Sequence, residues 1–278
     1  MNRPTMIQLE TSTACDARCV FCPHKDLKRH GGSMKEELFV SIIDQAADLG
    51  IPEVLLFLNG EPLLFPKLFT WLELLRDRGL ITAIFTNAAS LTAEKSERLM
   101  GFSDVIRVIC FSLGGFDRET YRAVMGLDYE TVYANVTRFL EVNDGAIPVE
   151  AHIPLMSKTV GFMDKWRERW GPLLLSAPTD MFNFAGLVSD ELELRESDRH
   201  KKGKCGRLDH LTVLWNGEVC LCCMDAEGQV ILGNLNQQSI MEAFNSETAV
   251  YYRTLHETGR FDELPLCKNC NMNMVGIT

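Results

Sequence analysis

The sequence has no long hydrophobic run and no secretory signal. Its 278 residues contain no stretch of 18 consecutive apolar residues, so no segment is long enough to form a membrane-spanning helix. The first fifteen residues, MNRPTMIQLETSTAC, lack an apolar core followed by a small-residue cleavage site. We therefore expect a cytoplasmic protein with no membrane partner.

Positive charge is also in short supply. Lys and Arg number 28 against 38 Asp and Glu, which gives a formal net charge of −10. Proteins that bind nucleic acids gather basic residues on one face to neutralise phosphates. The single basic run, RHKKGK at residues 199–204, is typical of a solvated loop. We expect no nucleic-acid partner, and the 46% of apolar residues fits an ordinary globular protein.

Cysteine, in contrast, is abundant and unevenly distributed. The cytoplasm keeps thiols reduced, so these residues need a role other than disulfide formation. Three lie near the start of the chain, one stands alone, and six lie further on: positions 15, 19, 22, 110, 205, 220, 222, 223, 267 and 270. The two groups predict two metal sites.

Strand-like and helix-like segments alternate between the two groups. The strands are expected at Met6–Glu10, Val54–Leu58, Ile81–Thr86, Val105–Leu113, Pro148–Leu155 and Met181–Leu187. The helices are expected at Met34–Leu49, Lys67–Arg78, Ala93–Met100, Tyr129–Val142 and Val160–Trp170. Such alternation predicts a parallel α/β sheet, either open or closed into an incomplete barrel, with its active site at the carboxyl ends of the strands.

The first cysteine group follows the first expected strand, where such a site would lie. Cys15, Cys19 and Cys22 have the spacing CxxxCxxC. Structural zinc takes four protein ligands, so a zinc site here would need His24 as the fourth. Three thiolates on a 4Fe-4S cluster would instead leave one iron open to a substrate or cofactor.

This loop resembles that of the radical S-adenosylmethionine (SAM) superfamily. The resemblance includes Phe21 before the last cysteine and the sequence Asn59-Gly60-Glu61-Pro62 after the second strand, which is similar to the family's GGEP motif. Asn59 departs from that motif, and an Asn tolerates the left-handed backbone that a glycine would adopt. The resemblance implies a partial (β/α)6 TIM-like barrel over residues 1–190.

The resemblance also implies the site residues. Cys15, Cys19 and Cys22 would hold the 4Fe-4S cluster. The residues expected to contact SAM are Phe21, Asn59, Gly60, Glu61, Pro62, Asn87 and Ser112. A reduced cluster would split SAM into a 5′-deoxyadenosyl radical that abstracts a hydrogen atom from the substrate, with a flavodoxin or ferredoxin-type protein as electron donor.

The second cysteine group follows a hairpin signal. Asn216-Gly217 separates two strand-like runs, and a CxxC follows at Cys267 and Cys270. A zinc ribbon has similar features. The segment also resembles the SPASM/twitch extension of radical SAM enzymes, which implies a small cysteine-rich domain at residues 191–278. By this resemblance, Cys205, Cys222, Cys267 and Cys270 would bind one auxiliary 4Fe-4S cluster, with Cys220 or Cys223 as alternatives to Cys222.

An auxiliary cluster suggests a two-electron oxidation, because it can accept the electron that a substrate radical loses. The comparable twitch enzymes are aminocyclitol alcohol dehydrogenases, so we expect a radical SAM oxidoreductase acting on a sugar, aminocyclitol or alcohol. His152 and Arg118 are candidate bases or substrate clamps. Cys110 is expected to face the barrel interior, either as core or as the hydrogen donor of an epimerase.

Two other functions remain open. Ribosomal-peptide maturases often carry a leader-binding module before the barrel, and only 14 residues precede Cys15 here, which favours a small substrate. A zinc-dependent interaction protein would also explain the cysteines. Iron and sulfide analysis distinguishes it from a radical enzyme.

Overall fold

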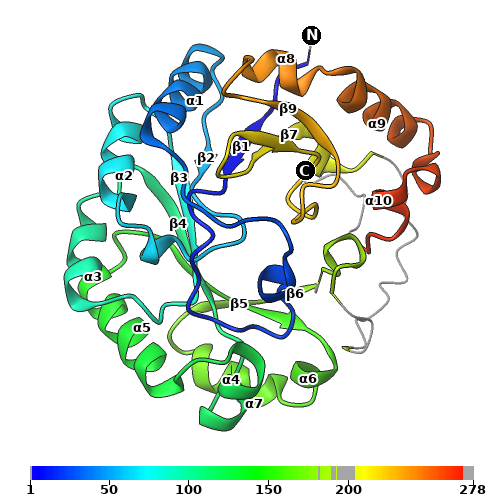
Figure 1. Ribbon diagram of the computed structural model, residues 1–278. Coiled ribbons are helices and arrows are strands. Elements are labelled where there is room, and N and C mark those ends of the chain that lie inside the picture. Colours follow the sequence, from blue (N-terminus) through cyan, green and yellow to red (C-terminus); the bar gives the residue numbers. More distant parts are fainter. Residues whose placement is uncertain (1, 181, 189–191, 193–203, 272–278) are drawn as a thin grey trace.

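The computed structural model describes residues 2–180, 182–188, 192 and 204–271. Helices surround a curved set of strands, with the loop after the first strand drawn in blue across the front (Figure 1). No helix in the described ranges is long and apolar enough to cross a membrane.

Six parallel strands form the predicted partial barrel. They are β1 Met6–Leu9, β2 Val54–Leu55, β3 Thr82–Thr86, β4 Ile106–Ser112, β5 Val149–Leu155 and β6 Leu175–Asp180. Strands β3 to β6 pair in chain order, β2 pairs with β1, and a parallel bridge from Glu53 to Ile81 joins the two sheets. The α/β barrel prediction is therefore confirmed.

Helices cover the outer face of these strands (Figure 1). They are α1 Glu36–Asp48, α2 Leu68–Arg76, α3 Ala93–Met100, α4 Arg118–Met125, α5 Tyr129–Asn143, α6 Ser157–Val160 and α7 Met163–Trp170. All five expected helices are present, and Thr92 caps α3 by accepting a hydrogen bond from the Lys95 N–H. The sequence analysis missed α4 and α6. A capping box between Asp117 and Thr120 marks the start of α4.

The position of the sixth strand was wrong. The apolar run Met181–Leu187 was expected to form it, but β6 lies just before that run and Phe184–Gly186 forms a 3-10 turn. The β6 sequence LSAPTD contains a proline and mostly small or polar residues. A strand at the edge of its sheet tolerates a missing N–H, so hydrophobicity does not identify it.

Two tryptophans of α7 fix the chain that leaves β4. Trp166 and Trp170 are fully buried, and their indole N–H groups donate to the carbonyls of Leu113 (2.7 Å) and Gly115 (2.8 Å). These bonds satisfy carbonyls that no strand partner reaches. They hold the carboxyl end of β4 against the helical layer.

The C-terminal part extends the sheet that contains β1 and β2. Its elements are β7 His210–Val213, β8 Glu218–Cys220, β9 Ile231–Asn234, α8 Ile240–Phe244, α9 Glu247–Glu257 and α10 Pro265–Lys268. Strand β7 pairs parallel with β1, and β7 and β8 form the expected hairpin. The predicted boundary at residues 190/191 lies outside the described residues.

Candidate active site

The first three cysteines lie in the loop after β1. Backbone N–H groups of Arg18 and Val20 donate to the carbonyls of Met125 and Val124, both at 2.9 Å, which fixes the loop against the end of α4. The pKa of all three thiols is raised, that of Cys15 to about 11, and burial is the main cause. Repulsion from the neighbouring thiolates contributes to the rise for Cys15 and Cys19. Several buried thiols that raise one another's pKa are suited to a metal centre, because metal coordination stabilises the deprotonated form.

His24 contributes to the structure of the loop. Its Nε2 donates to the carbonyl of Thr13 at 2.6 Å, so the ring ties the cysteine loop to its own beginning. Among the residues that the structure describes, His24 and the three cysteines include no group of three ligand atoms within 4.8 Å of one another, as the ligands of a tetrahedral zinc ion would be. This spacing favours the three-cysteine interpretation.

Gly60 brings the second loop against the cysteine loop. A Cβ atom at this position would lie 2.1 Å from the carbonyl oxygen of Ser12, and the next N–H, that of Glu61, donates to the carbonyl of Ala14 at 2.8 Å. Real Cβ atoms do not approach backbone so closely, so only glycine fits. The close approach explains the glycine of the Gly60-Glu61-Pro62 sequence in this chain.

Glu61 is buried at the junction of β2 and β3. Its carboxylate accepts hydrogen bonds from the Leu63 N–H (3.0 Å), the Thr86 hydroxyl (2.7 Å) and the Asn87 N–H (2.9 Å). Burial nevertheless raises its pKa to about 7, with these hydrogen bonds acting in the opposite direction. A cationic amino group next to this carboxylate would stabilise its charged form.

Asn87 fastens the cysteine loop to the end of β3. Its Nδ2 donates to Asp16 Oδ1 at 2.8 Å, and the Ser90 hydroxyl donates to the other Asp16 oxygen at 2.8 Å. Sequence reasoning missed Asp16, although it lies between the first two cysteines. Asn87 was expected to contact SAM, and in the structure its side chain positions the loop.

A buried ion pair lies behind these loops. Glu10 is fully buried, and Arg29 Nη1 donates to Glu10 Oε2 at 2.8 Å. Asn59 Nδ2 donates to Glu10 Oε1 at 3.1 Å, so Asn59 belongs to this network as well. Arg29 Nε also donates to the carbonyl of Ala226 at 2.6 Å, which links the cysteine loop to the C-terminal part. The sequence analysis missed both charged residues.

Three polar side chains face one another inside the barrel. In register, Cys110 and Ser112 of β4 lie opposite Glu150 and His152 of β5. His152 Nε2 donates to Glu150 Oε2 at 2.9 Å, and the ring meets Phe85 edge-on at 6.1 Å between centroids. The three ligand-type atoms of Cys110, Glu150 and His152 lie within 4.8 Å of one another. Glu150 was not predicted, although its period-two relation to His152 could have found it.

Cys110 is a neutral thiol. Burial and the charge of Glu150 raise its pKa to about 12, and its Sγ lies 3.8 Å from Glu150 Oε2. Its side chain packs with Leu55, Ala83 and Val108 in a small apolar cluster inside the strands. The inward orientation agrees with the expectation from the sequence.

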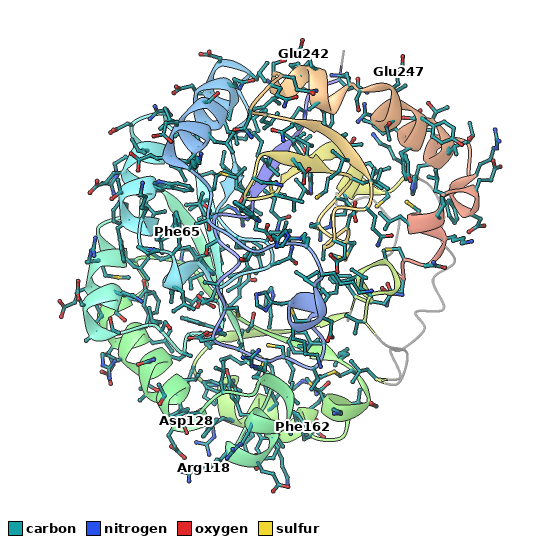
Figure 2. All side chains as sticks on the ribbon, viewed as in Figure 1. Phe65, Arg118, Asp128, Phe162, Glu242 and Glu247 are labelled. Atoms are coloured by element: carbon teal, nitrogen blue, oxygen red, sulfur yellow. The ribbon has the colours of Figure 1, made fainter. Side chains whose placement is uncertain are left out.

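Arg118 does not belong to this interior. It begins α4 on the outer surface (Figure 2). Its side chain is 74% exposed and lies 3.6 Å from Glu130. The expectation that Arg118 serves as a base or a clamp is corrected by this position.

Four cysteines of the second group line one cavity. Its lining includes Cys205, Cys222, Cys267 and Cys270, together with Arg207 and His256. Cys220 is fully buried elsewhere, with its Sγ directed at the carbonyls of Thr212 (3.8 Å) and Cys222 (3.6 Å). The chemistry of four converging thiols fits a metal cluster.

Comparison with known proteins identifies the family. Residues 9–157, more than half of the chain, match the radical SAM superfamily, and residues 205–271 match SPASM, an iron-sulfur cluster-binding domain. The chain belongs to the radical SAM superfamily. The recognition made from CxxxCxxC and Gly60-Glu61-Pro62 is thereby confirmed.

Several relatives of this radical SAM chain span most of its length. An S-adenosyl-L-methionine-dependent 2-deoxy-scyllo-inosamine dehydrogenase of Niallia circulans is 24% identical over 277 residues, which cover 96% of this chain and 92% of the relative. The structure of BtrN with AdoMet and 2-DOIA has a TM-score of 0.69 at 20% identity, covering 98% and 95% of the two chains. Streptococcus suis SuiB bound to precursor peptide SuiA has a TM-score of 0.75 at 14% identity, covering 91% and 67%.

The residues of this radical SAM site fit the groups that the family binds. Three partly buried thiols lie close enough for repulsion to raise the pKa of Cys15 and Cys19, and they lie near the buried carboxylate of Glu61, whose pKa is raised to about 7. The thiols suit an iron-sulfur cluster, and the carboxylate suits an ammonium group such as that of SAM.

Substituting Gly60 with alanine tests the close approach of the two loops. We expect Gly60→Ala to separate the loops and to weaken SAM binding at least tenfold, about 1.4 kcal/mol, because its Cβ would collide with the Ser12 carbonyl. Calorimetric titration of the anaerobic protein with SAM measures this. Gly161→Ala is the control, since a Cβ there meets nothing within 4 Å. Unchanged SAM affinity in Gly60→Ala would contradict the steric argument.

Removing Arg29 tests the buried ion pair. We expect Arg29→Met to lower the free energy of unfolding by about 3–5 kcal/mol, because it leaves the Glu10 carboxylate buried without its cation. Arg78→Met is the control. It removes a partly exposed pair with Asp44, for which a loss of at most about 1 kcal/mol is expected. Urea denaturation measures the free energy of unfolding of both variants. Equal losses would contradict the argument that burial makes the Glu10–Arg29 pair more important for stability than an exposed pair.

Proposed function

We propose that this radical SAM protein oxidises a small alcohol, sugar or aminocyclitol by two electrons. The observation that carries the proposal is the His152–Glu150 pair inside the barrel, which supplies a proton acceptor in register with Ser112. The dehydrogenase relative, which aligns with 96% of this chain, supports the reaction class.

The proposed ligand sets follow the two cysteine groups. Cys15, Cys19 and Cys22 would hold the SAM-binding 4Fe-4S cluster, and Cys205, Cys222, Cys267 and Cys270 would hold one auxiliary cluster. Gly60, Glu61 and Pro62, with Asn59 behind them, would contact the amino group of SAM. Ser112 and Asn87 would contact its ribose or methionine part, and the backbone near Phe21 its adenine. When bound, these groups supply a 5′-deoxyadenosyl radical that removes one hydrogen atom from a substrate C–H bond.

The chain's own residues would complete the oxidation. The substrate radical must lose one electron and one proton to give a carbonyl product. Because the Glu150 carboxylate accepts the Nε2–H of His152, the Nδ1 of His152 keeps its lone pair and would take the proton from the substrate O–H. Glu150 would stabilise the resulting imidazolium, as a carboxylate does beside a catalytic histidine.

Two further functions are weighed against this one. A neutral Cys110 thiol inside the barrel supports an epimerase, in which it returns a hydrogen atom to the substrate radical. The fold similarity to SuiB bound to its precursor peptide supports a peptide substrate. The small-molecule oxidation is preferred because the His152–Glu150 pair serves proton loss, which an epimerase does not need. We propose a flavodoxin or ferredoxin-type electron donor and a cytoplasmic location.

Iron analysis tests the two ligand sets. After anaerobic reconstitution we expect about eight irons per chain from two clusters, and about four in a Cys267→Ala/Cys270→Ala variant. Cys220→Ala is the control and should keep about eight, because its thiol faces backbone carbonyls. Bound zinc in place of iron, or unchanged iron in the double variant, would contradict the auxiliary cluster.

Product analysis tests the roles of His152 and Cys110. We expect His152→Leu to lower carbonyl formation by about a hundredfold, the usual contribution of a general base, while 5′-deoxyadenosine still forms. Cys110→Ala should still give product, because the oxidation needs no returned hydrogen atom. The assay is anaerobic turnover with candidate alcohols and aminocyclitols. Loss of product in Cys110→Ala, with an inverted carbon that carries solvent deuterium in the unaltered enzyme, would establish the epimerase instead.

A further inference from the structure

Two basic side chains line the cavity of the second cysteine group. Arg207 lies in the 3-10 turn Gly206–Asp209, and His256 lies on α9. Neither is a cluster ligand in the proposed set. Their position next to four thiols suggests an electrostatic role.

His256 directs a nitrogen at a proposed ligand. The side chain is buried, and its Nε2 lies 3.3 Å from Cys267 Sγ. A cysteine bound to iron is a thiolate and can only accept, so the imidazole must donate its Nε2–H to the sulfur. The ring packs against Phe261, with 5.8 Å between centroids and 29° between planes, which fixes its orientation.

Arg207 brings a positive charge to the same cavity. It follows Cys205 by two residues, and its buried Nε has no hydrogen-bond partner among the residues that the structure describes. Arg207 lines the same cavity as Cys205, Cys222, Cys267 and Cys270, so its charge lies beside the thiols that would hold the cluster.

We propose that Arg207 and His256 raise the reduction potential of the auxiliary cluster and so adapt it to accept the substrate's electron. Reduction adds negative charge to a site already surrounded by thiolates. A nearby cation and an N–H donor to sulfur stabilise that added charge, and such contacts set cluster potentials. The inference rests on the proposed function, in which the substrate radical loses one electron here and one proton to His152. A one-electron carrier protein of the flavodoxin or ferredoxin class would later remove the electron.

Anaerobic redox titration tests the proposal without turnover. A Cys15→Ala/Cys19→Ala/Cys22→Ala background leaves only the auxiliary cluster, whose reduced form is followed by electron paramagnetic resonance. In this background we expect Arg207→Gln and His256→Leu each to disfavour reduction by roughly tenfold, which is about 59 mV for one electron. Arg207→Lys keeps the charge and His256→Gln keeps an N–H donor, so both should stay close to the background potential.

An exposed arginine provides the control for net charge. Arg167→Gln removes the same charge from α7, where the side chain is 53% exposed beside Asp164, and should leave the potential unchanged. Unshifted potentials in Arg207→Gln and His256→Leu with iron retained would overturn this inference but not the proposed function. Absence of iron from the background protein would overturn the auxiliary cluster itself. If Arg207→Gln alone loses its iron, the potentials of His256→Leu and His256→Gln still test the proposal. A lower potential in His256→Leu than in His256→Gln would support it, and equal potentials would overturn it.

Discussion

The buried ion pair between Glu10 and Arg29 is the contact on which the arrangement of the site depends. A carboxylate that is fully buried is stable only if its charge is paired and its oxygens accept hydrogen bonds. Glu10 follows the last residue of β1, Asn59 comes from the loop after β2, and Arg29 comes from the far end of the cysteine loop. The Trp215 N–H also donates to Glu10, at 3.4 Å, so this one side chain joins segments that the sequence separates by up to 205 residues.

The cysteine loop needs such anchors because it has little regular structure of its own. Between β1 and α1 only the 3-10 turn Pro23–Asp26 and an isolated bridge from Ser12 to Ser33 are regular in the described chain. Asp16 is held by Asn87 and Ser90, and Gly60 allows the neighbouring loop to pack on Ser12. The anchors hold the thiols together although their pKa values show that burial and mutual repulsion disfavour their ionisation. Cluster binding would relieve that repulsion, so it is coupled to the stability of the loop.

The features that the sequence could predict depend on residues close together in the chain. Three such motifs are the CxxxCxxC spacing, the Gly60-Glu61-Pro62 sequence and the Asn216-Gly217 turn. The family and the hairpin that they predicted are confirmed. The fold class followed from the alternation of strands and helices. The position of strand β6 was not predicted because a strand at the edge of a sheet needs few hydrophobic residues. The role of Arg118 was predicted wrongly because the sequence does not show which way the first turn of a helix faces.

The contacts that sequence reasoning missed are those between distant segments. Nothing in the sequence pairs Glu10 with Arg29 or Asp16 with Asn87. Each pairing arises only when parallel strands bring their carboxyl ends together. Asn87 illustrates the consequence: the sequence suggested a contact with the cofactor, and the structure adds a contact that sequence reasoning missed, between its amide and Asp16 in the loop that carries the cysteines.

The same contacts relate the two cysteine sites to each other. Strand β7 pairs with β1 over four residue pairs, and Arg29 donates to the carbonyl of Ala226 three residues beyond Cys223. The backbone N–H groups of Lys28 and Arg29 also donate to the carboxylate of Glu227, at 2.8 and 3.1 Å. A continuous sheet and a buried cation thus fix the second site relative to the first. This fixed geometry is what the proposed two-electron oxidation, divided between two centres, would require.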